Sequence, residues 1–139
     1  MPHTIRMTAP PAKLGFFKLN VPEMAPALAF WREAFGFAVT ATFDEPEFLE
    51  HMTALGGQEA GPHLLLVEHK DGRPVPVGPG HGPVGLICAD IVASHERAVA
   101  FGAEPLTGLF EAAGVRIATR HRWRGWDVHP AHFHAGDCG

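Results

Sequence analysis

The fold is decided by residues 14–37, which read LGFFKLNVPEMAPALAFWREAFGF. This stretch has the pattern of a short apolar strand, an acidic residue and then a helix that ends at Gly36. Residues 83–104, PVGLICADIVASHERAVAFGAE, repeat the same order with different letters. Because each copy of a repeat must form a similar unit, we expect two similar units that pack together.

The first strand of the repeat alternates between two faces over residues 16–21. One face carries Phe17, Leu19 and Val21, and the opposite face carries Phe16, Lys18 and Asn20. We therefore expect the first face to be covered by the helix that follows and the second to lie open.

That helix is expected to begin near Glu23, whose carboxylate favours a helix start, and to end at Gly36, which suits a left-handed C-terminal cap. In the second copy, Asp90 or Ser94 is expected to cap the helix start. The apolar stripe expected on the first helix consists of Met24, Leu28, Trp31 and Phe35.

Strand-like segments follow each helix, so each copy is predicted to be a βαβββ module. The predicted fold class is α+β, with two tandem βαβββ modules in a single domain. The second module is expected to contain one continuous strand over residues 115–123. The predicted organisation is a flexible arm at 1–13, a first module at 14–69, a Pro- and Gly-rich linker at 70–82 and a second module at 83–139.

The composition excludes several classes of protein. A formal net charge of -4 argues against general nucleic-acid binding, and no apolar run is long enough to span a membrane. The two cysteines, Cys88 and Cys138, do not make a disulfide framework, so a reducing cytoplasm is the expected location. Cys88 is expected to be a buried small apolar residue and not a nucleophile.

Three short phrases carry a family resemblance: V-P-E at 21–23, F-W-R at 30–32 and F-G-F at 35–37. In a tandem βαβββ chain of this size, they resemble the vicinal-oxygen-chelate superfamily of glyoxalase I, bleomycin-resistance proteins, fosfomycin-resistance enzymes and extradiol dioxygenases. Members often have Asp and Tyr where this chain has Glu23 and Trp31. The resemblance implies an open curled sheet around a cavity, a small organic ligand in that cavity and a homodimer.

Metal-dependent members of that family place ligands on the first, fifth and eighth strands. By the resemblance, these positions fall on Phe16, Pro83 and His134. Neither Phe16 nor Pro83 can ligate a metal. The expectation is therefore a cavity without the family's metal centre and without another cofactor.

The alternative is a displaced metal site near the C-terminus. His132 and His134 are two residues apart, so a strand would place both on one face. Glu68, His81 or His121 would complete a site for a divalent Zn, Fe, Mn or Ni ion. The protein would then be a metal-dependent lyase or an extradiol-type dioxygenase. The other interpretation is that these histidines only line a polar pocket.

Seven residues are predicted to lie near the ligand: Phe16, Lys18, Asn20, Trp123, Trp126, His132 and His134. Aromatic walls with a few polar groups are typical of small-molecule pockets. The alternatives stay open, since large aromatic residues are equally common in cores and Lys18 and Asn20 suit a solvent-exposed edge.

In residues 115–124, VRIATRHRWR, the arginines all stand at even positions, so a strand would place them on one face. If the arginines face the cavity, they would bind a carboxylate or phosphate. We favour the interpretation that they form a solvated or intersubunit face. His51 and His95 are assigned no role.

Overall fold

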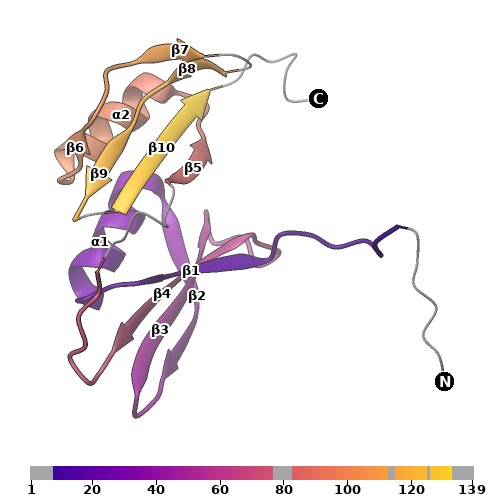
Figure 1. Ribbon diagram of the computed structural model, residues 1–139, viewed down its shortest axis with the longest axis vertical. Coiled ribbons are helices and arrows are strands. Elements are labelled where there is room, and N and C mark those ends of the chain that lie inside the picture. Colours follow the sequence, from indigo (N-terminus) through magenta and orange to yellow (C-terminus); the bar gives the residue numbers. More distant parts are fainter. Residues whose placement is uncertain (1–7, 77–82, 113–114, 125, 133–139) are drawn as a thin grey trace.

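The computed structural model describes residues 8–76, 83–112, 115–124 and 126–132. The predicted α+β fold with two tandem modules is confirmed. Figure 1 shows one sheet in each half of the molecule, with residues 8–15, before β1 (Phe16–Asn20), extending away from both. No helix in the described part of the chain combines the length and apolarity needed to cross a membrane.

The first module forms a four-stranded sheet in the order β1-β4-β3-β2. Its other elements are α1 (Met24–Phe35), β2 (Phe37–Asp44), β3 (Phe48–Leu55) and β4 (His63–His69). The edge strand β1 runs parallel to β4, while β3 is antiparallel to both of its neighbours. The connection from β1 to β4 through a helix and two strands is what allows this parallel pairing.

The second module repeats this arrangement with shorter strands. Its elements are β5 (Val84–Ile87), α2 (Ile91–Ala100), β6 (Glu104–Pro105), β7 (Phe110–Ala112), β8 (Val115–Ala118), β9 (His121–Trp123) and β10 (Trp126–His132). The edge strand β5 runs parallel to β10, and both β8 and β9 are antiparallel to β10. The strands β8 and β9, both next to β10, therefore occupy the position that β3 has in the first module. The strands β7 and β6, next to them, occupy the position of β2.

The expectation of one continuous strand over residues 115–123 is wrong. The chain leaves the strand at Thr119 and Arg120, where side chains replace part of the ladder. The Thr119 hydroxyl donates to the Thr107 carbonyl over 3.0 Å, and the Arg120 N–H donates to the Thr107 hydroxyl over 2.9 Å. These two bonds hold the interruption in place because they satisfy backbone groups that a regular ladder would have paired.

The two helices begin in different ways. Asp90 caps α2, as predicted, by accepting a hydrogen bond from the Ala93 N–H over 3.0 Å. The side chain of Glu23 makes no such bond at the start of α1. Instead Glu68, from β4, accepts a hydrogen bond from the Met24 N–H over 2.9 Å. Glu68, which is distant in sequence, therefore caps α1 in place of Glu23.

The core lies between the sheets and the helices, and α1 packs against α2. The predicted stripe on α1 is correct for Met24 and Trp31, which are buried, and in part for Leu28 and Phe35, which pack on the core half-buried. Phe30 lies outside the predicted stripe but is also buried. Its ring stacks on Trp123 of the second module, with ring centroids 4.6 Å apart, so α1 has an apolar face toward each module.

The two faces of β1 are as predicted except at Phe17, which was expected under the helix but is 40% exposed. Leu19 and the following Val21 are buried under the helix, whereas Phe16, Lys18 and Asn20 are exposed on the open face. Alternation along this strand therefore separates the core from a surface that can receive a ligand.

Candidate functional site

A small pocket of about 150 Å³ lies on the open side of the first module, where β1 ends. Four polar side chains and an aromatic ring reach it from separate parts of the chain. Its lining consists of Lys18, Asn20, His69, Arg73, Pro74, Val75, Pro76 and Trp126. The elements that meet here are β1, the end of β4, the segment after β4 and the start of β10.

Lys18 is held by a carboxylate on the neighbouring part of the sheet. Its Nζ donates to Glu50 Oε1 over 2.9 Å. The Glu50 side chain is almost fully buried, and charged side chains are rarely buried without a partner. Asn20, by contrast, makes no side-chain hydrogen bond with any described residue. Its amide is therefore available to a ligand as both donor and acceptor.

Arg73 is positioned by Asp71 at the mouth of the pocket. Two nitrogens of its guanidinium donate to the Asp71 carboxylate, the shorter contact being 2.6 Å. The hydrogen bonds from Arg73 lower the pKa of Asp71 to about 2, so this pair stays ionised at ordinary pH. Guanidinium groups bind planar anions well, and Arg73 has N–H donors beyond those that Asp71 uses.

The structure brings together three of the seven residues predicted to lie near a ligand, namely Lys18, Asn20 and Trp126. Trp123 lies elsewhere, buried against Phe30 in the core. Phe16 lies at the opposite end of β1, beside His63 of β4. His132 is the last residue of β10, but its side chain and all of His134 lie outside the described residues.

Two of the three positions that the resemblance assigns to metal ligands carry side chains without a ligand atom, and the third, His134, lies outside the described residues. Phe16 and Pro83 offer no ligand atom, and one carboxylate oxygen of Glu68 already accepts from the start of α1. His81 lies outside the described residues. Among the residues that the structure describes, no three His, Cys, Asp or Glu side chains are grouped to hold an ion.

His121 forms a hydrogen bond with a residue that the sequence did not indicate as its partner. Its Nε2 and the Nδ1 of His95 on α2 share a hydrogen bond of 2.9 Å, and the ring of His121 is fully buried. Burial, together with the nearby His95, lowers the pKa of His121 to about 4. The ring is therefore neutral at ordinary pH, and it joins α2 to the second sheet.

The arginines after β8 lie mostly toward solvent, as favoured from the sequence. Arg120 and Arg122 both contact the Asp127 carboxylate, over 3.5 and 3.0 Å, and Arg124 is exposed. The opposite face carries the buried side chains of His121 and Trp123. None of these arginines lines the pocket at the end of β1.

Comparison with known proteins identifies the family to which this fold belongs. The family described as Glyoxalase/Bleomycin resistance protein/Dioxygenase superfamily matches residues 13–125. The chain belongs to this superfamily. A search of curated protein sequences finds no match to the chain.

Solved structures of the superfamily are similar in fold. Glyoxalase I of Leishmania major has a TM-score of 0.75 at 11% identity, over 88% of this chain and 87% of that one. Glyoxalase I of Zea mays has a TM-score of 0.77 at 13% identity, and the match spans 86% of this chain but 44% of the maize one. The genomically encoded fosfomycin resistance protein of Listeria monocytogenes has a TM-score of 0.64 at 12% identity, over 91% and 97%.

Identities this low establish the fold and leave the chemistry to the residues at the site. The superfamily member described here shares the tandem module with glyoxalase I and the fosfomycin resistance protein. By the resemblance, two of its expected metal-ligand positions carry Phe16 and Pro83.

Proposed function

We propose that this superfamily member binds a small organic molecule in the pocket at the end of β1. The observation that carries the proposal is the meeting of Lys18, Asn20 and Arg73 beside the Trp126 ring. Convergent polar groups beside an aromatic wall are typical of small-molecule sites. A ligand with an acceptor group would receive hydrogen bonds from the three polar side chains, while its flat apolar part lies along the indole.

We propose further that binding does not use the superfamily's metal centre. Two of the positions that hold ligands in metal-dependent members carry Phe16 and Pro83, and Glu68 is engaged at the start of α1. Without a Lewis acid, recognition depends on the hydrogen bonds and ionic contacts of the chain's own side chains. The ligand is then sequestered, or transformed by metal-free chemistry.

A second copy of the chain is expected to enlarge this site, since the resemblance implies a homodimer. The cysteine usage favours a reducing cytoplasm as its location. The open side of the sheets carries an exposed apolar residue that supports such a contact. Phe16 of β1 is 54% exposed. Large apolar side chains at sheet edges are commonly covered by a partner.

The test is a ligand-binding screen that is repeated with variants of the pocket residues. Untagged protein is screened by ligand-detected NMR against aromatic acids, amides and amines, and each hit is measured again with Lys18→Gln and Asn20→Ala. Loss of a charged hydrogen bond is expected to weaken binding about tenfold or more. Lys13→Gln, which removes the same charge from an exposed residue outside the pocket, is the control. Hits that bind Lys18→Gln as tightly as the natural chain would overturn this assignment.

A further inference from the structure

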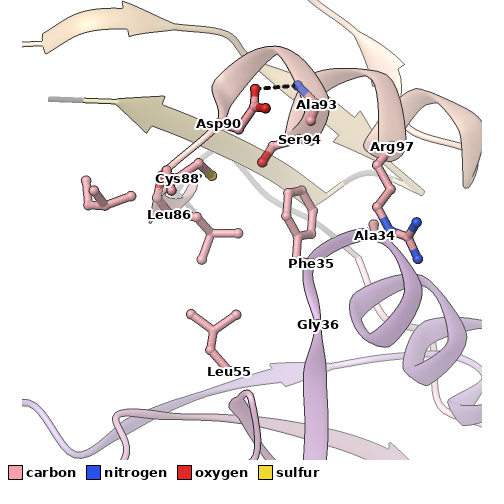
Figure 2. A pocket seen from close by; sticks show the side chains of 12 residues that line it. Ala34, Phe35, Gly36, Leu55, Leu86, Cys88, Asp90, Ala93, Ser94 and Arg97 are labelled. Atoms are coloured by element: carbon pink, nitrogen blue, oxygen red, sulfur yellow. Dashed lines mark hydrogen bonds between the residues drawn. The ribbon is translucent and has the colours of Figure 1, made fainter.

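A separate groove lies between the two modules, on the side of the helices. Figure 2 shows its polar end, where Phe35 of α1, Leu55 of β3 and Leu86 of β5 face Ser94 and Arg97 of α2. The hollow has a volume of about 470 Å³. It contains none of the residues that line the pocket at the end of β1.

The groove continues into an apolar hollow of about 330 Å³. The two hollows adjoin, because Leu55, Leu86 and Ile87 line both of them. The apolar end is completed by Leu14, Phe17, Phe37, Pro62, His63, Leu64, Val84 and Gly85. A ligand in this groove would therefore lie along both modules, with one end among aliphatic and aromatic side chains.

Exposed apolar side chains are concentrated in this groove. Leu14 is 70% exposed, Leu55 44% and Phe17 40%, and Ile87 also reaches solvent. A contiguous apolar patch in a concave surface marks a binding site more often than scattered exposed residues do. The volumes of the two hollows lie in the range of small-molecule pockets.

At the polar end of the groove, Ser94 and Arg97 have hydrogen-bond donors that no described residue engages. The Ser94 side chain points toward Phe35 in Figure 2 and makes no hydrogen bond with a described residue. Arg97 uses its Nε on the Glu33 carbonyl, and one terminal nitrogen lies 3.7 Å from the Glu33 carboxylate. The remaining guanidinium N–H groups face solvent, because the side chain is 55% exposed.

Glu33 pairs with Arg97 from α1, and Asp90 is the carboxylate that lines the groove itself. Asp90 turns toward the Ala93 N–H, away from the leucines, as Figure 2 shows. Ser94 and Arg97 are thus the groups that a ligand's polar end would meet.

We propose that this groove binds an amphipathic monocarboxylate, with its carboxylate on Arg97 and Ser94 and its aromatic or aliphatic body along Leu55 and Leu86. One guanidinium and one hydroxyl match the acceptors of a single carboxylate. Desolvating a doubly charged phosphate in this mostly apolar groove would cost more free energy than its contacts with these two groups would supply. This second site goes beyond the proposed function and does not depend on it.

The experiment is calorimetric titration with naphthoic acid and with naphthamide, a neutral ligand of nearly the same shape. The natural chain is expected to bind the acid at least about tenfold more tightly than the amide, because only the acid pairs with Arg97. Arg97→Gln should remove this difference, and Leu55→Gln should weaken both ligands. Arg32→Gln, which changes an exposed arginine on the opposite side of Glu33, is the matched control and should leave both affinities unchanged.

Lys18→Gln separates the two sites. If it abolishes acid binding while Arg97→Gln does not, the acid binds at the end of β1 and the groove proposal is overturned. Equal binding of acid and amide to the natural chain would also overturn it. So would a dimer that Leu55→Gln dissociates while the acid fails to bind, since the groove would then be an interface between copies. Far-ultraviolet circular dichroism confirms that each variant is folded.

Discussion

The two modules share a topology but achieve it with different interactions. The first has unbroken strands, an aromatic core around Trp31, and a helix whose start is capped from β4 by Glu68. The second has strands interrupted at Thr119 and a helix capped by its own Asp90. In place of an aromatic cluster, it joins helix to sheet through a hydrogen bond between the half-buried His95 and the buried His121. A repeated fold thus conserves strand order while its stabilising contacts diverge.

This difference makes the modules respond differently to mutation and to pH. Apolar packing in the first module is largely insensitive to pH, because no titrating group takes part in it. In the second module, His121 is held neutral by its burial, since burying a charge there is costly. The predictions below test that contrast, beginning with the largest expected effect.

Truncation of the first module's core should have the largest effect. Trp31→Ala removes a fully buried indole that packs edge-on against Phe30 and Phe37, and should lower the free energy of unfolding by about 3–5 kcal/mol. Urea denaturation measures the loss. Phe16→Ala, an aromatic truncation on the exposed face of β1, should change it by less than about 0.5 kcal/mol. Similar costs for the two variants would contradict this placement of the core.

Acid should weaken the second module through His121. Because the folded protein lowers its pKa from 6.5 to about 4, protonation favours the unfolded chain. The contribution is fully present above pH 6.5 and is lost as the pH falls from 6.5 to about 4. The expected loss is at most about 3 kcal/mol.

Comparison of two chains isolates that loss. The free energy of unfolding is measured for the natural chain and for His121→Gln across the same pH range. Other groups titrate in both proteins, so only the difference between their pH profiles reports on His121. The two profiles should converge in acid, and parallel profiles would show that the histidine pair does not control the pH response.

Removal of the helix caps should have the smallest effect and compares the modules directly. Glu68→Ala and Asp90→Ala should each cost about 1 kcal/mol, since each leaves a helix N–H without its carboxylate. Glu23→Ala should cost less than about 0.5 kcal/mol, because its side chain makes no capping bond. Thermal unfolding gives the order of the three variants. A larger loss for Glu23→Ala than for Glu68→Ala would show that the local carboxylate is the cap.

The sequence was sufficient for features that local patterns specify. Alternation along β1 predicted the burial of Leu19 but not the exposure of Phe17, and Gly36 predicted the end of α1, where the chain adopts a φ of 84°. Both depend on residues within one element. The repeat then predicted the second module because it presents the same order of elements.

Features that depend on distant residues could not be predicted in the same way. Glu68 caps a helix that starts 44 residues earlier, and His95 meets its partner 26 residues later. Parity placed Trp123 and the neighbouring arginines on opposite faces but did not say that α1 covers the tryptophan. For the same reason, Arg73 and His69 were missed at the pocket that Lys18, Asn20 and Trp126 helped to identify.

Native mass spectrometry of untagged protein, combined with elemental analysis, tests most directly whether this superfamily member binds an organic ligand without a metal. The account predicts a mass that exceeds the chain or its dimer by an organic adduct, with Zn, Fe, Mn and Ni well below one ion per chain. Lys18→Gln should lose the adduct. A stoichiometric metal ion that disappears in His134→Ala would contradict the account and establish a displaced metal centre.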